Sequence, residues 1–107
     1  MVLNMDRKQI AVDFAKSLNH PEIVKIILFG SVARDEDTED SDIDILIITS
    51  KKQDKRIIGD DVYDKVIDVL IKTGEHISVK IKHDSYYTKY KDFSFFSNVN
   101  KDGILIH

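Results

Sequence analysis

The sequence predicts an α/β (α+β) fold, in which helices pack on a small mixed β-sheet. Residues 23–29 (IVKIILF) and 43–49 (IDILIIT) are short, apolar and rich in β-branched side chains, as is typical of strands buried on both faces. Apolar residues recur at helical spacing over 10–18 and 54–73, so helices are expected to alternate with strands. With 107 residues, 42% of them hydrophobic, the chain is expected to form one domain, 1–107.

Capping and turn residues predict where the first elements begin and end. Asp6, with Gln9 three residues later, resembles the start of a helix, which should stop before Pro21 because the residue preceding a proline avoids helical geometry. Gly30 breaks the strand 23–29, and Ser31 is expected to cap a short helix that follows it.

The second half predicts a helix over 54–73 that ends at Gly74, followed by a half-exposed strand in which apolar and polar residues alternate from Ile77. Asp84 is expected to cap the next helix, and a second short helix and a last strand, 104–106, complete the chain. The aromatic side chains of these two helices are expected to lie mainly in the core, with a part left over for a dimer or partner interface. They are Tyr86, Tyr87, Tyr90, Phe93, Phe95 and Phe96.

Composition narrows the classes of function. The net charge of −3, without a stripe of Lys and Arg, argues against broad nucleic-acid binding. The absence of cysteine excludes disulfides and thiolate metal sites. The chain shows neither an apolar stretch of about 20 residues nor a signal-peptide core in its first ten residues, so we expect a cytoplasmic protein without a membrane span.

The pair Asp42 and Asp44 is the strongest indication of chemistry. Residues i and i+2 of a strand point to the same face, so both carboxylates should project together and repel each other. Mg²⁺ relieves such repulsion, because it takes one or two carboxylates together with the phosphates of a substrate. We therefore expect Asp42 and Asp44 to be catalytic metal ligands.

Gly30 and Ser31 suggest a phosphate cradle, since glycine allows close backbone approach and a serine at a helix start offers amide and hydroxyl donors. Arg34 either neutralises a phosphate or forms a surface ion pair with Asp35 or Glu36. The simpler reading of the whole segment is a turn, a cap and a solvated acidic loop that runs into a strand.

Gly30-Ser31, ten residues, and then Asp42-Ile43-Asp44 resembles the signature of the DNA polymerase beta-like nucleotidyltransferase superfamily. The stretch LFGSVARDEDTEDSDIDILI is similar to the minimal nucleotidyltransferases, many of which are antitoxin partners of HEPN-domain toxins. This resemblance implies the polymerase beta-like fold, ATP phosphates bound at Gly30 and Ser31, and Mg²⁺ held by Asp42 and Asp44.

The resemblance also implies a function: transfer of AMP from ATP to a hydroxyl of a HEPN partner protein. Two alternatives remain, an antitoxin-like subunit that blocks its partner by contact alone, and a nucleotidyltransferase for a small molecule. A homo-oligomer is a further possibility. One departure from the family stands out, because the strand that usually bears a third carboxylate offers Ser78 or Lys80 instead.

Overall fold

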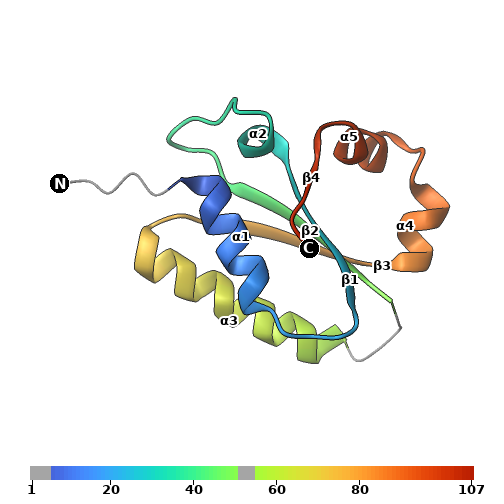
Figure 1. Ribbon diagram of the computed structural model, residues 1–107, viewed down its shortest axis with the longest axis horizontal. Coiled ribbons are helices and arrows are strands. Elements are labelled where there is room, and N and C mark those ends of the chain that lie inside the picture. Colours follow the sequence, from blue (N-terminus) through green and yellow to red (C-terminus); the bar gives the residue numbers. More distant parts are fainter. Residues whose placement is uncertain (1–5, 51–54) are drawn as a thin grey trace.

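The computed structural model describes residues 6–50 and 55–107, which form a four-stranded mixed sheet in the order β3-β2-β1-β4 (Figure 1). The strands are β1 (Ile23–Phe29), β2 (Ile43–Thr49), β3 (Ile77–His83) and β4 (Ile104–Leu105). β1 is antiparallel to β2 and β4, whereas β2 is parallel to β3. The predicted fold class is confirmed, and the last strand is one residue shorter than predicted.

Helices cover both faces of the sheet. They are α1 (Arg7–Ser17), α2 (Gly30–Ala33), α3 (Lys55–Thr73), α4 (Asp84–Tyr90) and α5 (Ser94–Asp102). α1 and α3 pack together on one face, and α4 and α5 lie on the other (Figure 1). Residue 54 of the predicted helix 54–73 lies outside the described residues, and the rest of that range is α3. None of the described helices is long and apolar enough to cross a membrane.

β2 is buried on both faces of the sheet, which explains why most of its residues are apolar. Ile43, Ile45 and Ile47 face α1 and α3, where they join a core that includes Phe14. Leu46 and Ile48 face the other way and pack in a smaller core below α4 and α5. Burying each side chain of this size contributes about 1.5–3 kcal/mol to the free energy of unfolding. Because its residues belong to both cores, β2 links the two layers of helices.

The aromatic side chains of α4 and α5 are less buried than predicted. Only Phe96 among the six is fully buried, together with Val99 of the same helix. Phe93, Tyr86 and Phe95 are 63%, 45% and 38% exposed. The expectation of a mainly core role was wrong, because two short helices of seven and nine residues cover only part of this face of the sheet.

The predicted start of α1 is confirmed, since the Asp6 side chain accepts a hydrogen bond from the backbone N–H of Lys8 at 2.9 Å. Gln9 does not complete a capping pair, because its amide donates instead to Asp13, one turn further along the helix. Gly74 follows α3 with a φ of +76°, and its N–H donates to the carbonyl of Leu70, as expected of a glycine that ends a helix.

Two predicted caps are wrong. α2 begins at Gly30 itself with Phe29 as N-cap, and no side chain of the described residues caps it, so Ser31 lies inside the first turn. The chain passes from strand to helix without an intervening residue because Gly30 adopts a φ of +78°. α4 is capped by His83, whose Nδ1 accepts from the N–H of Ser85, so Asp84 is the first helical residue.

Candidate active site

The candidate site lies where β1 ends and β2 begins. Phe29, the last residue of β1, is directly opposite Asp44 in the antiparallel ladder. Gly30 and Ser31 follow Phe29 at once, so the glycine-serine turn and the aspartate pair occupy the same end of the sheet. This juxtaposition, which the sequence predicts from the order of its strands, is confirmed.

Gly30 is required by two separate features of the turn. Its positive φ is rarely adopted by residues that carry a side chain. A Cβ atom at this position would also collide with Oδ2 of the Asp44 carboxylate. The backbone of the turn therefore lies directly against the Asp44 side chain, which would have to move if residue 30 carried a side chain.

Asp42 and Asp44 differ in their surroundings. Asp42 is exposed just before β2, and its Oδ1 lies 3.3 Å from Nδ1 of His76. Asp44 is half-buried, and both this burial and the charge of Asp42 raise the pKa of its carboxyl above the ordinary value, whereas Lys80 and Arg34 act in the opposite direction. The site thus concentrates negative charge that a bound cation would stabilise.

The position next to Asp44 on the neighbouring strand is Ser78. The parallel register pairs Asp44 with Ser78 and Leu46 with Lys80, so both β3 residues share the face of Asp44 and Ser78 is the closer one. Among the described residues, no three histidine, aspartate or glutamate side chains come together as a metal site. A metal would fit here with two carboxylates and with the phosphates of a nucleotide as its further ligands.

Arg34 forms a surface ion pair with Glu36, which is one of the two roles that the sequence predicts for it. Its Nε donates to Glu36 at 3.1 Å, and both side chains are exposed. Arg34 also lies close enough to Asp44 to favour its ionised form. The guanidinium therefore stands beside the aspartate pair, where its second predicted role, a contact with phosphate, remains a prediction.

Arg7 organises the acidic loop before Asp42, a role that the sequence does not reveal. From the start of α1 its guanidinium donates to Glu75 at 2.6 Å and to Asp37 at 2.9 Å. It also donates to the backbone carbonyls of Thr38 and Glu39. The partners are 30 to 68 residues away in sequence, so no local pattern indicates them.

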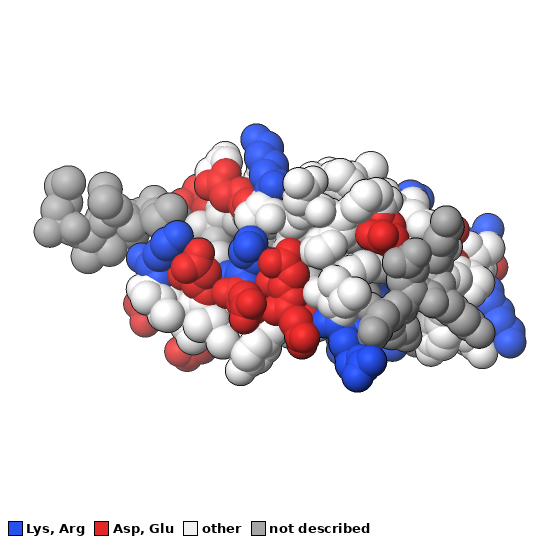
Figure 2. Space-filling model, turned by 90° about the horizontal axis from the view of Figure 1, so that it is seen from below, with Lys and Arg blue, Asp and Glu red and all other residues white. Residues whose placement is uncertain are grey.

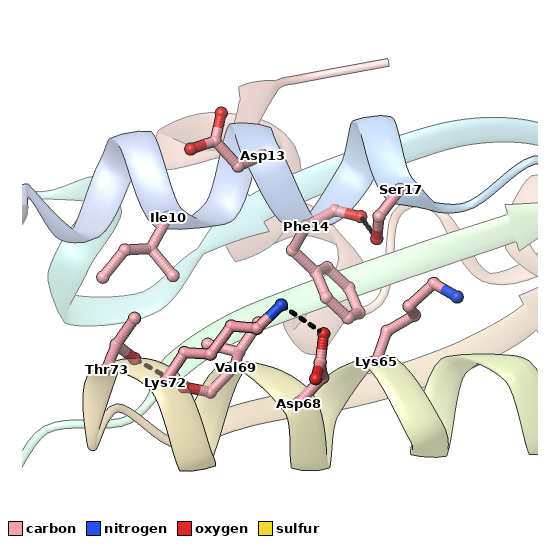
Figure 3. Close-up of a pocket in the computed structure, with 9 residues that line it drawn as sticks. All are labelled: Ile10, Asp13, Phe14, Ser17, Lys65, Asp68, Val69, Lys72 and Thr73. Atoms are coloured by element: carbon pink, nitrogen blue, oxygen red, sulfur yellow. Dashed lines mark hydrogen bonds and ion pairs between the residues drawn. The ribbon is translucent and has the colours of Figure 1, made fainter.

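A hollow of about 370 Å³ lies between α1 and α3 (Figure 3). These two helices pack on the face of the sheet opposite to the face that carries Asp44, Leu46 and Ile48. Ile10, Phe14 and Val69 contribute its apolar lining, and Lys72 pairs with Asp68 beside it at 3.0 Å. Acidic side chains gather on the face seen from below, the side on which α3 lies (Figure 2). Neither feature is part of the site around Asp44.

Three comparisons with known proteins bear on this site. The family model described as a nucleotidyltransferase domain matches residues 9–103. The candidate protein adenylyltransferase MJ0604 of Methanocaldococcus jannaschii is 60% identical over 37 residues, which are 35% of this chain and 37% of that protein. The matched segment thus spans little more than a third of this relative.

Solved structures share the fold. A toxin-antitoxin crystallised with AMP-PNP superimposes with a TM-score of 0.59 at 17% identity, covering 96% of this chain and 73% of that chain. A mutant of the toxin-antitoxin MntA-HpeT gives the same TM-score at 15% identity and the same coverage. Identities this low establish the similarity of the fold.

Proposed function

Because the chain belongs to the nucleotidyltransferase domain family, we propose that it transfers AMP from ATP, with Mg²⁺, to a hydroxyl of a partner protein. We further propose that the partner is a HEPN-type toxin and that this chain is its antitoxin. The observation that carries the proposal is the contact of the Gly30 backbone with the half-buried Asp44 carboxylate, with Asp42 beside it. This contact brings a turn that suits phosphate next to carboxylates that suit a metal.

The residues divide the work as follows. The backbone of Gly30 and the amide and hydroxyl of Ser31 hold the triphosphate, and Arg34 offsets its charge. Asp42 and Asp44 would hold Mg²⁺, which would neutralise negative charge on the triphosphate during the transfer. Arg7 holds Asp37 and Thr38 of the acidic loop that leads to Asp42.

In the proposed reaction the oxygen of the acceptor hydroxyl attacks the α-phosphorus of ATP. A new bond forms between that oxygen and phosphorus, the bond to the β-phosphate oxygen breaks, and pyrophosphate leaves. The hydroxyl proton passes to water. Positioning and charge neutralisation provide most of the acceleration in such transfers, so the chain needs few groups beyond those named.

Support for the partner comes from the fold. Two of the solved chains of similar fold come from toxin-antitoxin structures, one of them with AMP-PNP. The relative from Methanocaldococcus jannaschii is named for protein adenylylation, and its 37 matched residues are 60% identical to this chain.

The test uses ATP labelled at the α-phosphate, Mg²⁺, the purified chain and, as the proposed partner, the protein that the adjacent gene encodes. We expect label on the partner, and none when the label is on the γ-phosphate. Asp42→Asn and Asp44→Asn should abolish the transfer, whereas Asp40→Asn, which removes an exposed carboxylate of the same loop, should retain it. Transfer that survives both site variants would refute the assignment of these residues.

A second candidate is a subunit that neutralises its partner by contact alone. It is favoured by β3, which offers Ser78 beside Asp44 and then Lys80, but no carboxylate, on the strand where the family usually has a third one. Neutralisation that persists in the Asp42→Asn/Asp44→Asn double variant, with no label transferred by the wild type, would decide for this candidate. Label found on a small hydroxylated acceptor instead of a protein would decide for a small-molecule enzyme.

A further inference from the structure

A groove of about 340 Å³ lies on the same face of the sheet as Asp44, between β3, α4 and α5. Two lysines of β3 and aromatic rings of the two helices line it, chiefly Lys80, Lys82, Tyr86, Tyr90, Phe93 and Phe95. Three of the rings are exposed by more than a third. Such a volume is within the range of sites for small molecules.

The groove and the candidate active site are neighbours on one face of the sheet, because Lys80 and Phe95 of its lining lie close to Asp44 and Phe29 respectively. Lys80 and Lys82 share the face of Ser78, which pairs with Asp44, and they lie two and four residues further along β3. At about 3.3 Å per residue, Lys82 is roughly 13 Å along the strand from Ser78. At the same end, the ring of Phe95 meets that of Phe29 edge to face, with centroids 5.6 Å apart, and Phe29 directly precedes Gly30.

The walls of the groove are held in place by contacts between the two helices. The ring of Tyr86 packs against Phe96 at 5.9 Å, and the ring of Tyr87 packs against Phe96 at 5.4 Å. The hydroxyl of Tyr87 also donates to the side chain of Asn100 on α5. The rings therefore form a surface that exists before a ligand binds, which lowers the entropic cost of binding.

The lining combines flat rings with positive charge. The ammonium of Lys82 lies 5.1 Å from the centre of the Tyr86 ring, and that of Lys80 lies 5.8 Å from the centre of the Phe95 ring. Rings of this kind stack with nucleobases of any sequence, and lysines pair with phosphate and with base acceptor atoms. An apolar peptide would bury both ammonium groups without partners, at a high cost in free energy.

From these contacts we infer that the groove binds the base and ribose of the nucleoside triphosphate whose phosphates lie at Gly30 and Ser31. The base stacks on the rings of α4 and α5, and the lysines contact the nucleotide along β3. This inference rests on the proposed function, because it extends the same nucleotide away from Asp44. It assigns to Tyr86, Phe93 and Lys82 a role in nucleotide affinity.

The test compares two probes in the presence of Mg²⁺, ATP and inorganic tripolyphosphate, by isothermal titration calorimetry. Tyr86→Leu and Phe93→Leu should weaken ATP binding about 5- to 150-fold, which corresponds to one lost stacking contact, and leave tripolyphosphate binding unchanged. Tyr63→Leu is the matched control, because Tyr63 is 65% exposed on α3, across the sheet, and should alter neither.

The outcomes separate the two proposals. If ATP binds the wild type and both groove variants with equal affinity, and the double variant Asp42→Asn/Asp44→Asn binds ATP more weakly, the groove proposal alone is refuted. If the wild type binds ATP and tripolyphosphate no more tightly than the double variant does, the proposed function and the groove proposal are both refuted. Should a groove variant fail to fold, the wild type still decides, since nuclear Overhauser effects between the adenine protons and the Tyr86 or Phe93 ring are expected and their absence would refute the groove.

Discussion

Replacing Gly30 with alanine tests the close approach on which the candidate site depends. Gly30 has a φ of +78°, and an added Cβ would meet the Asp44 carboxylate. Gly74 offers a matched control, because its φ is +76° and an added Cβ would have no atom within 4 Å. Both substitutions therefore carry the same cost of placing alanine in left-handed geometry, but only Gly30→Ala adds a collision with Asp44.

The expected costs follow from these two terms. A left-handed alanine costs about 1–2 kcal/mol at either position. Alanine also restricts the unfolded chain, which stabilises both variants by about 0.4–1 kcal/mol. The collision adds about 1–3 kcal/mol at Gly30, as inserting a methylene into a packed site usually does. Gly30→Ala should thus lower the free energy of unfolding by about 1–3 kcal/mol more than Gly74→Ala does.

The measurement is urea unfolding followed by far-UV circular dichroism, since the chain has no tryptophan. The double variant Gly30→Ala/Asp44→Ala should recover part of the additional cost, because the carboxylate is then absent. Transfer activity should fall in Gly30→Ala and persist in Gly74→Ala. Equal losses of stability in the two single variants, with no recovery in the double variant, would refute the contact.

Arg7→Met should lower the free energy of unfolding by about 1–3 kcal/mol and speed limited proteolysis of the acidic loop, whereas Arg34→Met, which removes an exposed pair, should cost at most about 1 kcal/mol. Ser78→Asp adds a carboxylate beside the aspartate pair, so titration calorimetry with the nucleotide should show tighter Mg²⁺ binding, and a weaker one would contradict the assigned register. The hydrogen bond from His20 lowers the pKa of Asp61, so the ionised carboxylate stabilises the fold above about pH 4, and this contribution is lost as the pH falls through the folded-state pKa. Asp61→Asn should therefore be less stable than the wild type at pH 6, and the difference measured by urea unfolding should shrink as the pH falls below the ordinary pKa of an aspartate, about 4.

The parts of the fold that the sequence predicts correctly are those whose physics is local. Residues 26–28 of β1 and 45–48 of β2 are apolar and buried because helices cover both faces of the sheet there, whereas Val24 and Lys25, at the start of β1, are exposed and depart from the expected burial on both faces. Gly74 marks the end of α3 because a left-handed residue is cheapest as glycine. The neighbourhood of Gly30 and Asp44 also follows from the sequence, since it needs only that two consecutive strands pair.

The wrong predictions concern polar side chains that have several possible hydrogen-bond partners. Ser31 was expected to cap α2, but a glycine in left-handed geometry begins the helix one residue earlier. Asp84 was expected to cap α4, but the His83 ring accepts the N–H of Ser85 instead. The contacts of Arg7 span up to 68 residues and depend on how α1 meets the start of β3, which no local pattern contains.

The register of β3 shows which side chains stand beside Asp44 on the strand that lacks the third carboxylate of the family. Ser78 adds no negative charge beside Asp44, and Lys80, one pair further along, favours the ionised form of that aspartate. The site therefore carries less negative charge on β3 than one with a third carboxylate, so under the proposed function a metal held here would depend more strongly on the nucleotide phosphates as ligands. The same lysine lines the groove along β3, so a single strand supplies positive charge to both ends of the proposed nucleotide. It follows that metal and nucleotide should bind cooperatively: Mg²⁺ alone should bind weakly, and ATP should strengthen Mg²⁺ binding by the same factor by which Mg²⁺ strengthens ATP binding.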